Sequence, residues 1–187
     1  MNDRKVAEAV SIVLSFPILS IIEIVVINYI QAFKTVDLII AVMLHVVTPF
    51  LPPLVYSKVL KKGDIFVSKR EDRLPLFIPG ILAYFIAALY FSGGGYRLMA
   101  LLEVANLISS LLLFVISFKW KISIHMSSLA IPLFFFTLYG IRQALYFLPL
   151  LLLLGWARIK VKAHTLGQVI AGTIIGASST FIVFLAI

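Results

Sequence analysis

Two of the three histidines in this 187-residue chain lie next to groups of basic residues. His125 follows the lysine-containing stretch 119–121, and His164 follows Arg158 and the lysine-rich stretch 160–162. Histidine is the side chain best suited to act as a nucleophile or a proton donor near neutral pH, whereas Lys and Arg bind phosphate oxygens. The pattern therefore predicts a site that handles a phosphate group.

Three predicted helices begin close to these basic residues, at Pro75, at Ser123 and at His164. The first turn of a helix offers unpaired backbone N–H groups and the positive end of the helix dipole, which together suit an anion. Pro75 fits such a first turn because no N–H is needed there. A basic loop can also serve only to orient a protein in the membrane, so each lysine alone carries little weight.

Other ionisable residues lie inside apolar stretches. We expect His45 to be buried and hydrogen-bonded, with a functional role as the alternative. Glu23 and Glu103, with Asn106 near the latter, are costly in lipid and are expected to face the interior of a helix bundle. A substrate or proton path is the alternative for these carboxylates.

Composition places these residues in a membrane. The chain is 62% hydrophobic and 13% charged, with a mean hydropathy of +1.12, whereas a soluble domain is about 45–50% apolar and about 25% charged. The apolar runs are too long and continuous for the alternating strands of a barrel. We therefore predict an all-α, polytopic transmembrane bundle. The chain has no cysteine, which excludes disulfides and thiolate metal sites.

Six or seven membrane spans are expected, since one span takes about 20 apolar residues. Loops are then short, which leaves a single transmembrane domain over residues 1–187. The fifth and sixth spans are short, so six spans with a re-entrant segment is the alternative. The seven apolar stretches are 6–33, 37–60 (interrupted by three prolines), 74–92, 98–118, 123–139, 141–156 and 164–187.

Basic residues fall mostly on one side when these spans alternate. Thirteen of the 16 Lys and Arg residues lie on the side of the amino terminus and of the loops that precede the predicted helices at 74, 123 and 164. The net charge of +8 then reflects topology and a phosphate site, with no nucleic acid as partner. Positive charge marks the cytoplasmic side, so the candidate residues are expected to face the cytoplasm of a cell-membrane protein.

Three segments resemble the motifs of the type 2 phosphatidic acid phosphatase superfamily. Residues 157–168 (Ala-Arg-Ile-Lys-Val-Lys-Ala-His-Thr-Leu-Gly-Gln) resemble its third motif, Ser-Arg, five residues, His, three residues, Asp. Residues 122–125 (Ile-Ser-Ile-His) resemble the second motif, Pro-Ser-Gly-His, and residues 69–75 loosely resemble the first, Lys, six residues, Arg-Pro. The motifs keep their order, and the similarity covers roughly residues 60 to 180.

The resemblance implies a hydrolase that removes phosphate from a lipid phosphate or diphosphate in the bilayer, such as phosphatidic acid, phosphatidylglycerol phosphate or a polyprenyl diphosphate. His164 would be the nucleophile that forms a phosphohistidine, and His125 would protonate the leaving group. No metal or other cofactor is implied. The side chains that would hold the phosphate oxygens are those of Lys69, Arg73, Ser123 and Arg158, with Lys62 or Arg70 as the alternatives to Lys69.

The departures from the motifs bear on activity. Ala157 replaces a serine, and Gln168 replaces the aspartate that orients the nucleophile. A glutamine carbonyl can still accept a hydrogen bond from one imidazole nitrogen and so select the tautomer. It brings no negative charge, and a neutral hydrogen bond has about half the strength of a charge-assisted one. We therefore expect a slow nucleophile, with a catalytically silent relative that binds or translocates anionic lipids as the alternative.

Gly172 and Gly176 follow on the same helix stripe as His164 and Gln168. Small residues at this spacing let helix backbones approach closely in membranes. We therefore expect close packing that holds His164 rigidly against the helices carrying Arg73 and His125.

Overall fold

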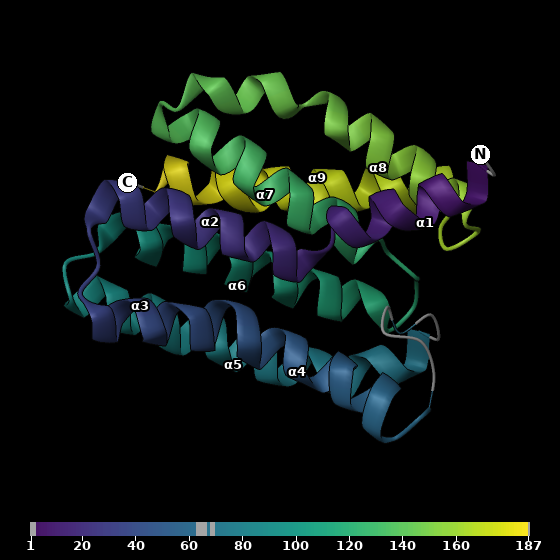
Figure 1. The fold of residues 1–187 in the computed structure, drawn as a ribbon, viewed down its shortest axis with the longest axis horizontal. Helices are drawn as coiled ribbons and strands as arrows, with labels where there is room; N and C mark the ends of the chain where they lie inside the picture. The colour runs from purple at the N-terminus through teal and green to yellow at the C-terminus, as the bar shows by residue number, and fades with distance from the viewer. Residues whose placement is uncertain (1–2, 63–66, 68–69, 187) are drawn as a thin grey trace. The chain divides into compact units, whose positions relative to one another are not determined.

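Every regular element in the part of the chain that the computed structural model describes, residues 3–62, 67 and 70–186, is helical (Figure 1). The predicted all-α class is therefore confirmed. The helices form two compact units. Met1–Leu19 and Lys121–Ile187 make up one, called here the terminal unit, and Ser20–Trp120 make up the other, called the central unit.

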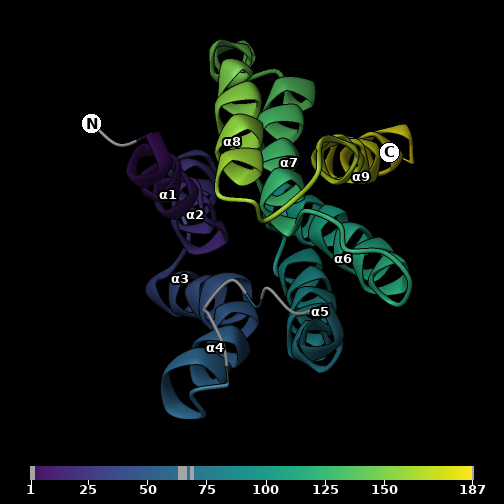
Figure 2. The same ribbon diagram turned by 90° about the vertical axis from the view of Figure 1, so that its right-hand side faces the viewer.

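The terminal unit is built around α7 and α9, which lie side by side (Figures 1 and 2). The two helices run parallel: Ser123 at the start of α7 donates its backbone N–H to Gln168 at the start of α9 (3.3 Å). Near their far ends, the rings of Phe135 and Phe184 pack 5.3 Å apart. The unit contains α1 (Asp3–Val13), the first residues of α2 (Phe16–Gln31), α7 (Ile124–Tyr139), the 3-10 helix η3 (Arg142–Phe147), α8 (Pro149–Lys160) and α9 (Leu166–Leu185).

Glycine allows this close approach. A Cβ atom added to Gly176 would lie 2.6 Å from the carbonyl oxygen of Ser127 and 2.9 Å from the Cβ of Ala130. A Cβ on Gly172 would overlap the carbonyl oxygen of Ser123. The predicted close packing is confirmed for α7, the helix that carries His125. Arg73 belongs to the other unit.

The first predicted span, 6–33, is not one straight helix. It consists of α1 and α2, which meet at an angle of 41° after Val13. Pro17 lies in the first turn of α2, and its ring provides no backbone N–H for a carbonyl of the preceding turn. The sequence pattern of apolar residues continues across the bend, which is why hydropathy alone did not reveal it.

The central unit contains a long helix that runs through three prolines. The interruption predicted by Pro49, Pro52 and Pro53 is wrong, because Thr35–Val59 is continuous over 25 residues. Proline has no N–H for the carbonyl four residues earlier, and the helix widens into π-helical turns beside the prolines. The elements are the rest of α2, α3 (Thr35–Ala41), the π-helix η1 (Val42–Val47), α4 (Thr48–Leu54), the π-helix η2 (Val55–Val59), α5 (Arg70–Gly93) and α6 (Arg97–Ser117).

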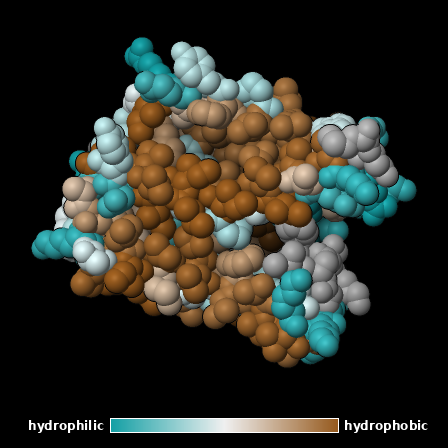
Figure 3. Space-filling model, viewed as in Figure 1, coloured by the Kyte–Doolittle hydropathy of each residue, from teal (hydrophilic) through white to brown (hydrophobic). Residues whose placement is uncertain are grey.

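Four helices in the described residues are long and apolar enough to cross a membrane, or five if the bent pair α1 and α2 forms one span. This count is below the six or seven predicted. The 16 residues of α7 and the 12 of α8 are shorter than the roughly 20 that a bilayer requires. Hydrophobic side chains cover most of the face drawn in Figure 3, as expected for a multi-pass membrane protein.

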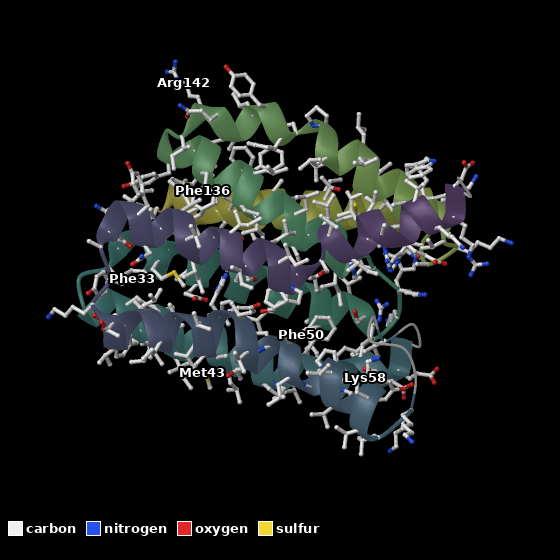
Figure 4. All side chains as sticks on the ribbon, viewed as in Figure 1. Phe33, Met43, Phe50, Lys58, Phe136 and Arg142 are labelled. Atoms are coloured by element: carbon white, nitrogen blue, oxygen red, sulfur yellow. The ribbon has the colours of Figure 1, made fainter. Side chains whose placement is uncertain are left out.

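Several basic residues lie in the last turns of helical elements. In the central unit, Lys58 lies near the end of η2, at the opposite end of this long helix from Phe33 (Figure 4). In the terminal unit, Arg142 begins η3, whereas Arg158 and Lys160 lie in the last turn of α8.

The amino end of α5 differs from the prediction. The helix begins at Arg70, so Pro75 lies inside it and not in its first turn. The acidic side chains of Glu71 and Asp72 occupy that first turn, where the helix dipole favours negative charge. This helix start is therefore a weaker anion site than the sequence indicated.

Candidate functional site

The turn between α8 and α9 brings Arg158 and His164 together. Lys162 adopts a left-handed backbone (φ +58°), and the N–H of Ala163 bonds back to the carbonyl of Arg158 (3.0 Å). This is the Schellman arrangement that ends many helices. The N–H of His164 reaches the same Arg158 carbonyl (3.3 Å). The segment from Arg158 to His164 thus closes in one tight turn.

The imidazole of His164 has a defined tautomer. Its Nδ1 lies 3.1 Å from Oε1 of Gln168, and the same oxygen accepts the backbone N–H of Thr165 (3.2 Å). A backbone N–H can only donate, so the atom between Thr165 and His164 is the amide oxygen, and Nδ1 of His164 must carry the proton. In the neutral ring, Nε2 then holds the lone pair, which is the state that a nucleophile needs.

Gln168 also closes a capping box at the start of α9. The Thr165 hydroxyl accepts the N–H of Gln168 (3.4 Å), and the Gln168 side chain accepts the N–H of Thr165. Thr165 is exposed and His164 is only 7% exposed. The cap therefore fixes the amide whose oxygen orients the buried imidazole.

Replacing Thr165 with alanine should separate the capping role from the orienting role. We expect the free energy of unfolding to fall by about 1 kcal/mol because one cap bond is lost. The Thr165 backbone N–H remains, so Gln168 keeps its orientation. Thermal unfolding in detergent measures the loss. An unchanged melting temperature would contradict the cap, and a shifted pH dependence of the His164 ring signals in NMR would contradict the orienting role of the backbone N–H.

Ser123 occupies the N-cap position of α7 beside this turn. Its side chain is fully buried, and its hydroxyl has no hydrogen-bond partner among the described residues. A buried hydroxyl without a partner is costly, and at a helix amino terminus it points to an anion that would accept from it. His125 lies in the first turn of the same helix and is half-buried.

Arg158 lies in the last turn of α8 and is 3% exposed. Ala157 beside it is fully buried, so the missing motif serine is replaced here by a packed methyl group. A guanidinium presents paired N–H donors that match phosphate oxygens, so Arg158 is of the type that holds a phosphate group. Five predicted site residues belong to the terminal unit: Ser123, His125, Arg158, His164 and Gln168.

The other two predicted phosphate ligands are not part of this unit. Arg73 belongs to the central unit, is 5% exposed and donates from Nε to the carbonyl of Val67 (2.6 Å). Lys69 lies outside the described residues. Their phosphate-binding roles stay predictions from the motif resemblance.

A second polar cluster lies in the central unit, and none of its residues belongs to the three motif segments. His45 on η1 is flanked by Glu23 on α2, at 2.7 Å, and by Glu103 on α6, at 3.0 Å. The expected burial of the three residues is observed. The sequence did not pair them, because they come from three helices far apart in the chain. The sequence feature that could have indicated this cluster is that ionisable residues are rare within apolar spans.

Comparison with protein-family models, with curated proteins and with solved structures finds no match to this chain. Fold, composition and helix lengths together describe an all-α protein with several helices long and apolar enough for a multi-pass membrane protein.

Proposed function

We propose that this chain is a membrane phosphatase that hydrolyses a lipid phosphate or diphosphate through a phosphohistidine on His164. The observation that carries the proposal is the pair of bonds to Gln168 Oε1, which holds the proton on Nδ1 and leaves the lone pair on Nε2. The resemblance to the type 2 phosphatidic acid phosphatases supplies the reaction class.

The reaction has two steps. Nε2 of His164 attacks phosphorus, the bond from phosphorus to the leaving oxygen breaks, and that oxygen takes a proton from His125. Water then attacks the phosphohistidine, gives a proton back to His125, and releases inorganic phosphate as the P–N bond breaks. Charge on the transferring group spreads over its oxygens, which Arg158, the Ser123 hydroxyl and the first N–H groups of α7 would stabilise.

The substrate class follows from the location. A protein with short loops and a site at helix ends meets molecules whose apolar tails stay in the bilayer. Phosphatidic acid, phosphatidylglycerol phosphate and polyprenyl diphosphates share a terminal phosphate at that depth. The partner is therefore a lipid and not a nucleic acid.

Purified protein in detergent, assayed for inorganic phosphate release from these three lipids in the presence of a chelator, tests the proposal. We expect release from at least one of them. Binding of a lipid phosphate without release would favour the alternative, a silent relative that binds or translocates anionic lipids. Absence of both binding and release would overturn the phosphate site altogether.

Changes at Gln168 should alter the rate in opposite directions. Gln168→Leu removes the acceptor for Nδ1, and we expect kcat to fall by about 10- to 100-fold, since neutral hydrogen bonds contribute about 1 kcal/mol and tautomer selection adds to this. Gln168→Asp restores a charged acceptor, and we expect kcat to rise by about tenfold. Steady-state phosphate release measures both. A leucine variant as fast as the wild type would contradict the orienting role.

We also propose that α7 and the η3–α8 segment cross the membrane, which gives seven crossings with the basic ends in the cytoplasm. Short helices can span by locally thinning the bilayer. A protease-cleavable tag inserted in the segment 61–69, before α5, tests the orientation. Protection in intact cells is expected, and cleavage there would place the basic ends outside.

A further inference from the structure

The polar cluster in the central unit is independent of the phosphate site. His45 is fully buried, Glu23 is 3% exposed and Glu103 is fully buried. The groups that face His45 come from three helices: Glu23 from α2, Glu103 from α6 and Tyr84 from α5, whose ring centre lies 6.0 Å from that of His45. These four side chains are the titratable groups of the cluster.

Both nitrogens of the His45 ring face a carboxylate oxygen, Nε2 at 2.7 Å and Nδ1 at 3.0 Å. A neutral imidazole has only one N–H. The second nitrogen would then direct its lone pair at a carboxylate, which is repulsive unless a further proton is present. The geometry therefore holds at least one proton beyond those of a neutral histidine and two carboxylates.

One added proton leaves the cluster with a net charge of −1. In a membrane span an uncompensated charge is unfavourable. The two carboxylates differ in how well they are stabilised. Glu23 has the shorter contact with the ring, 2.7 Å from Nε2. The contact of Glu103 with Nδ1 is longer, at 3.0 Å, and its other oxygen, Oε2, has no hydrogen bond among the described residues. Glu103 is thus the group on which a second proton is most favourable.

The backbone around His45 is also unusual. The N–H of Thr48 bonds to the carbonyl of Met43, five residues earlier, and the Thr48 hydroxyl bonds to the same carbonyl (2.8 Å). Pro49 follows and offers no N–H to the carbonyl of His45. Such π-helical turns are rare and occur frequently at functional sites.

We propose that Glu23, His45 and Glu103 form a proton-binding site within the membrane-spanning part of the central unit, and that a proton is taken up and released on the Glu103 carboxyl. The ligand is the proton itself. A metal ion is not the ligand, because no group of three or more acidic, histidine or cysteine side chains in the described part of the chain has a geometry that could hold one. Protonation would change the charge that joins α2, η1 and α6.

Infrared spectroscopy of the purified protein across a pH series tests the site through the C=O stretch of a protonated carboxyl group. Above about pH 6, where exposed carboxyl groups are ionised, we expect this band in the wild type, its loss as the pH rises further, and its absence in Glu103→Gln. Glu8→Gln is the matched control, because Glu8 is exposed and pairs with Arg4 at the surface; its band should equal that of the wild type.

If Glu103→Gln does not fold, NMR of the wild-type protein with ¹⁵N-labelled histidine still tests the proton site. Signals of His125 and His164 are assigned by replacing each with glutamine, which leaves His45. We expect both His45 nitrogens to be protonated at low pH and their shifts to move together with the infrared band. A carboxyl band that persists in Glu103→Gln, or His45 shifts that stay constant across the pH series in the folded protein, would overturn the proton site and leave a permanent structural ion pair.

Discussion

Replacing His164 with alanine is expected to reduce phosphate release by at least about 1,000-fold, because the group that forms the covalent bond is lost. The Nδ1 bond to Gln168 is lost as well, but the capping box between Thr165 and Gln168 does not involve the imidazole. The start of α9 should therefore remain folded. Release of inorganic phosphate in detergent, with thermal unfolding measured in parallel, checks both halves of this expectation.

The comparison with His125→Ala makes this prediction specific. A proton donor matters most when the leaving group is a poor one such as an alcohol. His125→Ala should therefore lose far more activity on phosphatidic acid than on a phosphate ester of an acidic phenol, whereas His164→Ala should be inactive on both. Trapped phosphate on His164, found by mass spectrometry after acid-free quenching, would establish the intermediate. Equal activity of His164→Ala and wild type would refute the nucleophile.

Gly172→Ala is expected to have the second-largest effect, although it adds only one methyl group. Alanine gains about 1 kcal/mol of helix propensity over glycine. The new Cβ would overlap the carbonyl oxygen of Ser123 and lie 3.1 Å from the Cβ of Met126. Overpacking of this kind costs about 1–3 kcal/mol, and the obstacle is backbone that cannot rotate away. The free-energy cost of the clash should therefore exceed the gain from helix propensity.

Separation of α7 from α9 should also disturb the candidate site. The N–H of Ser123 bonds to the carbonyl of Gln168 at this contact, so any shift moves the buried hydroxyl relative to His164. We expect a lower melting temperature and at least a tenfold loss of phosphate release, because catalysis is sensitive to displacements of about 1 Å.

Gly93→Ala is the matched control, since a Cβ there meets no atom within 4 Å. It should keep the melting temperature and the activity of the wild type. If Gly172→Ala had wild-type stability and activity, the two helices could separate without consequence. That result would contradict the claim that their close packing supports the site.

Much of the fold could be predicted from the sequence, because the composition of a membrane span is dictated by the solvent around it. Long apolar runs gave the helices α5, α6 and α9 nearly to their ends. The predictions failed where the hydrogen bonds of the backbone decide the course of a helix. The bend before Pro17 and the unbroken helix through Pro49 depend on where carbonyl groups find donors, and hydropathy does not report that.

Part of the chemistry of the terminal unit could also be predicted from the sequence. The four-residue spacing of His164 and Gln168 placed both on one helix face, and the hydrogen bond between them has the expected partners. The second role of the Gln168 oxygen, as the acceptor for the backbone of Thr165, was not predicted. It depends on where the helix starts, and helix starts are uncertain by one or two residues in any reading of sequence.

The sequence by itself determined that this is a helical membrane protein with one-sided basic charge and with histidines beside basic residues, because those properties follow from residue types and short spacings. Only the tertiary structure decided which distant groups meet. Glu23, His45 and Glu103 come from three helices, and a contact of this kind depends on how helices pack, which no local pattern encodes. The buried hydroxyl of Ser123 beside Gln168 is decided in the same way, by glycines that let two backbones approach.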